Sequence, residues 1–448
     1  MASQPLTIKQ GCYFIQFEPD PPLDGVKHYD GTMRVENVGN NIITSGDLYV
    51  HSPDSNREEP DPGKGIPIFP ISDYRFWLHV TEIIPRFEET NSFTALFEPH
   101  RFRRDERTFI NFGTCVAEMT KKSAPSAYPS GSDYFTGKVT QKSTGTPFGT
   151  LTMGWVSENL RRAVLEIDRV KKPPAMAQPE FPLNQGTLIA GELKDDSLKN
   201  WQDAFEKVKW KIAAPSNNGI SASDSGIAEP DPNDGGFWTE AELHEQMLHS
   251  RVNSTDLDKE WHYYLLCVRR ITTQERGVLF DVGGTDSNNM PREGAAIASA
   301  WPFPPDVPKD PVWGEIDDSL KGQPFGAQKG PYFRAAVHEI GHAMGLDHNS
   351  ADDGFMNTTD AIAEDTALGK FPANIKYEFA ADDQKRLRHG PDICVRPGGV
   401  FWTRGNSVFP DTTTLGDAAA VIDSKQFDLQ VSAPLVDSKR EKTLEPLV

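Results

Sequence analysis

The amino-acid sequence predicts an α/β domain that follows an all-β N-terminal region and precedes a short β-like C-terminal segment. In residues 1–172, short alternating apolar runs are separated by turn residues, which is typical of half-buried strands. A Pro-rich segment comes next. After it, apolar residues recur at helical spacing, and one long apolar run suits a central strand. We expect this second part to contain a twisted mixed sheet and long helices.

The N-terminal region, residues 1–172, is predicted to be sandwich-like. Runs such as 32–35, 47–50 and 76–80 alternate apolar and polar side chains, and clusters rich in Gly, Pro, Asn and Asp separate them. The 36 Gly and 35 Pro of the 448 residues also favour many turns. We expect this region to serve as a docking module or a prodomain.

The rest of the chain divides into three parts. Residues 173–190 lack periodicity and are predicted to form a linker. Residues 191–392 form the predicted α/β domain, and residues 393–448 return to turns and short β runs. The first helix of the α/β domain is expected over 197–212, because apolar side chains recur there at helical spacing, namely Leu198, Trp201, Phe205, Val208 and Ile212.

Composition excludes several classes of function. The chain has 65 acidic and 46 basic residues and a formal net charge of −19, which repels nucleic acid and anionic lipid. No apolar run approaches the roughly 18 residues of a membrane span, and the N-terminus shows no classical signal peptide. The acidic balance suits a dispersed, secreted or soluble protein, and we predict a secreted or extracellular location.

The four cysteines argue against a cysteine-built zinc site. They lie far apart in the sequence and form no CxxC pair, so a dense disulfide framework is disfavoured as well. One or two long-range disulfides remain open among Cys12, Cys115, Cys267 and Cys394.

The segment PYFRAAVHEIGHAMGLDH, residues 331–348, contains a candidate metal site. His338 and His342 are four residues apart, so they project from one helical face about one turn apart. Both imidazoles can then reach one zinc ion at about 2.0–2.1 Å. Gly345 lets the helix end in a left-handed turn, after which the chain can bring His348 to the same ion. Three protein ligands leave a fourth position for water, as a catalytic zinc site requires.

Glu339 is predicted to be the general base. It sits beside the first ligand and can bond to the metal-bound water, whose pKa zinc lowers to about 7. A lone H-E-x-x-H occurs by chance, and a closed structural zinc site would need a fourth protein ligand. Here three histidines, a glutamate and a glycine occupy the required positions together, which favours a catalytic zinc site over both alternatives.

The segment HEIGHAMGLDH, residues 338–348, resembles the long signature H-E-x-x-H-x-x-G-x-x-H of the metzincin zinc metalloproteases. Met356, eight residues after His348, resembles the Met-turn of that family, and the short interval is most similar to its matrixin-like branch. The resemblance implies a metzincin-like catalytic domain. It also implies a zinc-dependent endopeptidase that hydrolyses peptide bonds in protein substrates by Glu-assisted attack of zinc-bound water.

The resemblance also implies a strand that pairs with an extended substrate. This substrate edge strand would comprise Gly294, Ala295, Ala296, Ile297 and Ala298. The sequence departs from the family in two ways. Asn349 follows the third histidine where matrixins carry a small hydroxyl residue, and the histidine-rich segment that holds a second zinc has no counterpart in 213–330. We therefore predict one catalytic zinc ion.

Calcium binding is left open. Asp281 and Asp286 lie in a Gly-rich loop, and residues 231–236 and the Asp352-Asp353 pair also offer oxygen ligands. None of these segments has the spacing of an EF-hand, and plain surface turns explain them more simply.

Two other functions remain as alternatives to a protease. The chain could be a binding or adhesion protein whose protease domain is secondary or vestigial, or an effector delivered into another cell. A protein or peptide substrate is the partner expected for the protease, with no nucleic acid and no membrane span. The oligomeric state is not predicted.

Overall fold

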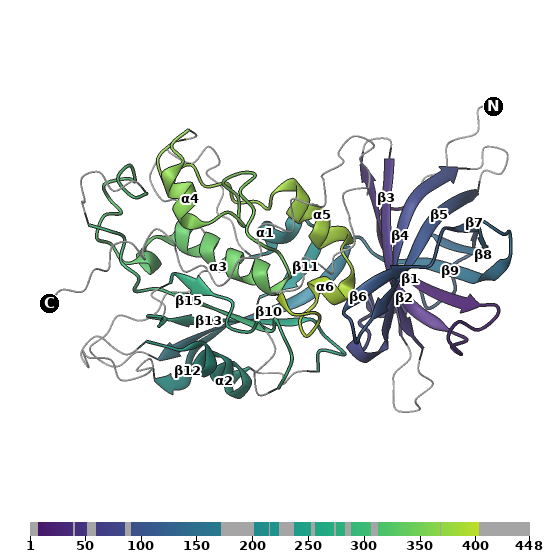
Figure 1. The fold of residues 1–448 in the computed structure, drawn as a ribbon, viewed down its shortest axis with the longest axis horizontal. Coiled ribbons are helices and arrows are strands. Elements are labelled where there is room, and N and C mark those ends of the chain that lie inside the picture. Colours follow the sequence, from purple (N-terminus) through teal and green to yellow (C-terminus); the bar gives the residue numbers. More distant parts are fainter. Residues whose placement is uncertain are drawn as a thin grey trace.

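Two β-sheets dominate the structure, and the helices lie mainly around the second sheet (Figure 1). The structure is a computed structural model, and it describes residues 8–38, 41–51, 60–85, 91–171, 201–214, 216–223, 237–251, 256–272, 275–282, 288–305, 312–367 and 369–402. The predicted linker at 173–190, the calcium candidates Asp286 and 231–236, and the chain after residue 402 lie outside these ranges.

The first sheet closes on itself as an antiparallel barrel. Its strands follow the order β4-β3-β2-β1-β9-β8-β7-β5, and β5 pairs back with β4, while β6 extends from β5 outside the circle. The strands are β1 (Gly11–Pro19), β2 (Tyr29–Val38), β3 (Asn41–Val50), β4 (Tyr74–Pro85), β5 (Ser92–Arg103), β6 (Thr108–Asn111), β7 (Cys115–Lys122), β8 (Tyr134–Gln141) and β9 (Pro147–Ser157).

Alternation along each strand decides which side chains fill the barrel. In β4, Phe76, Leu78 and Val80 belong to the apolar core. Because successive side chains of a strand point to opposite faces, Trp77 and His79 face outward.

The loop between β3 and β4 contains two single 3-10 turns, η1 (Pro62–Lys64) and η2 (Ile71–Asp73).

The second sheet is smaller and mostly parallel. Its order is β11-β10-β13-β15-β14, with β12 also paired to β10, and only β14 runs antiparallel to its neighbour. The strands are β10 (Arg161–Lys171), β11 (Trp210–Ala213), β12 (Ser216–Ser223), β13 (His262–Val268), β14 (Gly277–Val278) and β15 (Gly294–Ala298). Every residue of β13 is buried, which agrees with the apolar run that follows His262.

The helices of the described residues are short. They are α1 (Trp201–Glu206), α2 (Glu240–Ser250), α3 (Lys329–Ala343), α4 (Thr359–Glu364), α5 (Ala381–His389) and α6 (Asp392–Val395), and a third 3-10 turn, η3 (Phe325–Ala327), precedes α3. The longest, α3, has 15 residues. None of the described helices has the length and apolar character needed to cross a membrane.

The predicted fold class is wrong. The described chain is mostly β, with a closed barrel where a sandwich-like region was expected and short helices where long ones were expected. The helix expected over 197–212 shows why the predicted helices are too long. Within the described residues α1 ends at Glu206, and Lys209 takes a positive φ of 57° before β11 begins. Val208, Trp210 and Ile212 are two residues apart and all buried, a spacing that suits a strand better than a helix.

The border between the two sheets lies within residues 1–172. β10 lies within residues 1–172, yet it pairs with β11, β12 and β13 of the second sheet. The change from one sheet to the other therefore occurs between Ser157, the last residue of β9, and Arg161, the first residue of β10.

A buried ionic network joins the barrel to the second half of the molecule. It lies where α6 comes beside the barrel (Figure 1). Arg34 of β2 lies 2.6 Å from the Asp47 carboxylate of β3 and 3.0 Å from the Asp392 carboxylate of α6. Arg161 of β10 also pairs with Asp392 at 3.0 Å, and the Tyr49 hydroxyl donates to Asp392 at 2.9 Å. Burial alone would raise the pKa of Asp392, but the two arginines hold it below its usual value.

His389 at the end of α5 is a second polar contact between the two halves. Its Nδ1 lies 3.1 Å from the Ser45 hydroxyl, and its Nε2 lies 3.2 Å from the Glu36 carboxylate. One ring nitrogen can thus accept and the other donate, as a neutral imidazole requires. Burial lowers the pKa of His389 to about 4, and the neighbouring Glu36 opposes this shift only in part.

Candidate metal centre

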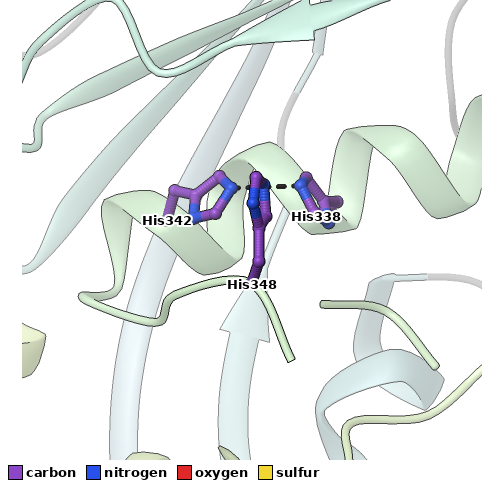
Figure 2. Close-up of side chains that lie close together, drawn as sticks. All are labelled: His338, His342 and His348. Carbon is purple, nitrogen blue, oxygen red and sulfur yellow. Dashed lines mark hydrogen bonds between the residues drawn. The ribbon is translucent and has the colours of Figure 1, made fainter. Parts of the chain in front are cut away.

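Helix α3 carries the first two histidines of the candidate site. All residues from Gly330 to Ala343 are buried. The Nε2 atoms of His338 and His342 are 3.0 Å apart, with ring centroids 4.5 Å apart. His348 comes from the segment that follows, and its ring centroid lies 5.1 Å from that of His338 and 4.9 Å from that of His342. Figure 2 shows the three imidazoles directed toward one another.

A glycine turn brings His348 back to the helix. Gly345 has a φ of +83°, and a Cβ at this position would lie 2.3 Å from the carbonyl oxygen of Cys394. Both the left-handed backbone and the close contact exclude a side chain here. The Leu346 amide then donates to the Gly341 carbonyl at 3.0 Å, which closes the end of the helix.

Backbone carbonyls set the tautomers of the two helix histidines. The Nδ1 of His338 lies 2.8 Å from the Phe355 carbonyl oxygen, and the Nδ1 of His342 lies 2.8 Å from that of Leu346. A carbonyl can only accept, so each Nδ1 carries the proton and each Nε2 presents a lone pair. Burial lowers the pKa of His342 to about 3 and that of His338 well below its usual value, so both rings are neutral.

The donor set fits a zinc ion. One nitrogen from each of the three histidines lies within 4.8 Å of the other two. In His338 and His342, two lone pairs face each other across 3.0 Å, an unfavourable arrangement that a cation between them makes favourable. Three neutral imidazoles are suitable ligands for zinc, and the exposed position of His348 leaves one side of the set accessible.

Glu339 is buried next to the edge of the second sheet. A Cβ on Gly277 of β14 would lie 2.6 Å from Cγ and 2.7 Å from Oε1 of Glu339, so the backbone of β14 packs directly on this side chain. Burial and the charge of Glu275 raise the pKa of Glu339 to about 8, against the opposing effect of Arg334 and Arg276.

Met356 packs beneath the turn of α3 that bears the two histidines. It is buried, and a Cβ on Gly341 would lie 2.3 Å from its sulfur. Gly341 separates the histidines in sequence, and its missing side chain makes room for the methionine. The Asn349 amide also donates to the Met356 carbonyl at 2.9 Å, which ties the segment after His348 to the same loop.

Sequence reasoning missed two residues that support the site. Arg334 lies one helical turn before His338, and its buried guanidinium donates to the Gly354 carbonyl at 3.1 Å and to Thr359 Oγ1 at 3.0 Å. It thereby holds the loop that contains Met356. Trp402 donates from Nε1 to the Leu346 carbonyl at 2.9 Å, and its ring centroid lies 5.1 Å from that of His342. No local motif marks either residue.

The expected substrate strand, Gly294–Ala298, is not at the edge of the sheet. It forms β15, which pairs with β13 on one side and with β14 on the other and is buried throughout. The strand at the edge is β14, which borders Glu339. Because β14 has only two residues, it shows no alternation in the sequence, and the sequence could not reveal it as a strand.

The remaining candidates are aspartates that are not grouped with the three histidines. Asp281 is buried and accepts from the Glu293 amide at 2.7 Å, and Asp352 accepts from the Gly354 amide at 3.0 Å. Calcium binding stays a prediction at both. The four cysteines are all buried and free, so neither of the disulfides left open by the sequence forms in this structure.

This chain matches no protein-family model, no curated protein and no solved structure. The assignment to a matrixin-like branch of the metzincins is wrong, because no family model matches and a closed antiparallel barrel with few, short helices does not fit the α/β matrixin fold. The geometry of the residues themselves is independent of that assignment.

Proposed function

We propose that this protein is a zinc-dependent endopeptidase that hydrolyses peptide bonds in protein substrates. The observation that carries the proposal is the pair of inward-facing Nε2 atoms of His338 and His342, 3.0 Å apart, with both Nδ1 atoms bonded to backbone carbonyls. A purely structural cluster of histidines would satisfy its nitrogens within the protein. Here two Nε2 atoms of neighbouring rings face one another while both Nδ1 atoms contact carbonyls, as in ligands of a shared cation.

His338, His342 and His348 would hold the ion. Zinc, when bound, supplies Lewis acidity that polarises a substrate carbonyl and makes water more acidic. The chain's own contribution is to orient the rings. The Phe355 and Leu346 carbonyls fix the two helix histidines, and Trp402 bonds to the same Leu346 carbonyl.

Glu339 is the general base of the proposal. Its position directly after His338 keeps it on the same helix but off the direction of the ligands. It accepts a proton from the attacking water and passes that proton to the departing amine. Burial against β14 excludes bulk water from this carboxylate. A nearby cation favours its ionised form, which a base requires.

The edge of the second sheet supports a peptide as the substrate. β14 is the last strand of the sheet, so its outer backbone groups have no neighbouring strand among the described residues. An extended peptide can add to such an edge through main-chain hydrogen bonds. Because β14 packs on Glu339, a peptide bound there would pass close to the proposed base.

The variant Glu339→Gln tests the proposal. We expect it to retain zinc, measured by elemental analysis, and to lose cleavage of a broad peptide library. The matched control is Glu364→Gln, which changes an exposed glutamate at the end of α4 and should cleave like the wild type. Undiminished cleavage by Glu339→Gln would overturn the mechanism. Zinc binding by the wild type without any cleavage would instead favour a binding protein with a vestigial site.

A further inference from the structure

We propose a second transition-metal site on the outer face of the barrel, formed by His79, Glu98 and His100. One ligand atom from each residue lies within 4.8 Å of the other two. The site is independent of the three histidines near α3, because it is built on the two strands that close the barrel.

The strand pairing places these three side chains together. His79 of β4 lies directly opposite Glu98 of β5. His100 follows Glu98 by two residues on β5, so both project from the same face. Trp77 shares this face, stacks on the His79 ring at 5.3 Å and lies 5.2 Å from the His100 ring. The ladder of a closed barrel gives such a site a rigid scaffold.

The observation that points to an ion is the Nε2 atom of His100. This nitrogen is buried and has no hydrogen-bond partner among the described residues. The Oε2 atom of Glu98 lies 3.7 Å from this nitrogen, which is too long for a hydrogen bond. Two atoms that bind one zinc ion at about 2.0–2.1 Å each can stand no more than about 4.2 Å apart. The pair is therefore spaced as ligands are.

Neighbouring groups orient the carboxylate. Oε2 of Glu98 accepts from Nδ2 of Asn111 at 2.9 Å, and Oε1 accepts from the Thr114 hydroxyl at 3.5 Å. Metal-binding carboxylates commonly receive such supporting hydrogen bonds. Two imidazoles with one carboxylate suit zinc, nickel or cobalt rather than calcium or magnesium, which prefer oxygen ligands. The side chains of His100 and Glu98 are 15% and 29% exposed, so an ion can reach them.

In two similar clusters a carboxylate is already bonded within the protein. Asp30 binds His28 at 3.0 Å and His51 at 2.6 Å, and both contacts are ordinary hydrogen bonds. In the cluster of His244, Asp281 and Glu293, the two carboxylate oxygens of Glu293 are already bonded to Arg251 and Asn288, each at 2.6 Å. The positive charge of Arg251 already balances that carboxylate.

Metal analysis of the full chain tests the second site. The protein is stripped with a chelator, loaded with zinc, passed through gel filtration and analysed for bound metal. We expect about two equivalents for the wild type, about one for His100→Gln and for His342→Gln, and none for the double variant. His51→Gln is the matched control and should keep both equivalents. Because each variant removes a ligand of one site only, the metal content reports on each site separately. A negative result at one site does not change the conclusion about the other.

Three results would overturn the second site. They are a single equivalent in the wild type, an unchanged metal content in His100→Gln, and loss of the second equivalent in His51→Gln. Far-ultraviolet circular dichroism of the metal-free protein checks that each variant folds. If His100→Gln does not fold, Glu98→Gln replaces it, because that carboxylate is partly exposed. Copper loading gives a further readout, since two ligating nitrogens produce hyperfine structure in the paramagnetic resonance spectrum that His100→Gln should reduce.

Discussion

The buried histidine at the barrel junction and the two buried histidines of α3 differ in what faces their ring nitrogens. At the barrel junction, His389 has the Ser45 hydroxyl at one nitrogen and the Glu36 carboxylate at the other. On α3, the Nδ1 atoms of His338 and His342 each contact a backbone carbonyl, and the two Nε2 atoms face each other. Both environments keep the rings neutral. Burial therefore does not separate a structural histidine from a metal ligand, whereas the direction of the free lone pair does.

The sharpest test of this comparison is a matched pair of substitutions, His342→Asn and His389→Asn. The first removes a proposed ligand, so peptide cleavage should fall by several orders of magnitude and the equivalent of zinc bound by the three histidines should be lost. The second should leave kcat/KM of the folded protein within a few fold of wild type and cost about 1–3 kcal/mol of stability, because it leaves buried partners unsatisfied. Peptide cleavage and urea unfolding measure the two effects. If His389→Asn lost cleavage and zinc while His342→Asn kept both, the distinction between the two kinds of histidine would be wrong.

The junction itself should respond most strongly to the loss of a charge. In Asp392→Asn, the buried guanidinium groups of Arg34 and Arg161 lose the carboxylate they share. We expect the free energy of unfolding to fall by about 3–5 kcal/mol, since breaking a buried ion pair leaves uncompensated charge. Denaturant unfolding measures this loss. Zinc content per folded molecule should stay at the wild-type value, and a parallel loss of zinc would show that the junction and the metal site are coupled.

Acid should destabilise the protein through His389. Its pKa is about 4 in the folded state, against about 6.5 for an ordinary histidine. Between these values the unfolded state binds more protons, so stability falls as the pH drops from about 6.5 to 4 and this contribution then levels off. The loss is on the order of 3 kcal/mol. Unfolding measured against pH in the presence of a chelator should show it in the wild type, and the slope should flatten in His389→Asn.

Zinc should stabilise the folded protein by a smaller amount. At a free concentration 100 times the dissociation constant, a ligand that binds only the folded state contributes about 2.7 kcal/mol. We expect Tm to rise with added zinc in the wild type and in His389→Asn. Scanning calorimetry of the variant lacking both His342 and His100 should show no rise, because both proposed sites are removed. A rise of wild-type size in that variant would contradict both sites.

The histidine cluster could be predicted from the sequence because its geometry is local. His338 and His342 share a helical face by their spacing, and Gly345 supplies a turn that few other residues allow. The supporting residues could not be predicted. Arg334 and Trp402 act through contacts with distant backbone carbonyls, and no sequence interval encodes such contacts.

The closed barrel could not be predicted because local alternation is the same in barrels and sandwiches. Closure depends on the pairing of β4 with β5 while β5 also pairs with β7, which no single strand reveals. The place of β10 depends likewise on its parallel partner β13, about a hundred residues later in the chain. The strand β13 itself was identifiable, because a run of buried apolar residues suits the centre of a sheet.

The short passage from β9 to β10 limits how the molecule can be divided. Only residues 158–160 connect the two strands, and Leu160 among them is buried and bonded to the Lys209 carbonyl. A protease that cut the chain just after Lys171 would leave β10 attached to the barrel. The remaining fragment would then lack the strand on which β11, β12 and β13 all assemble. Release of the barrel by such a cleavage would dismantle the sheet beside the histidines instead of uncovering it.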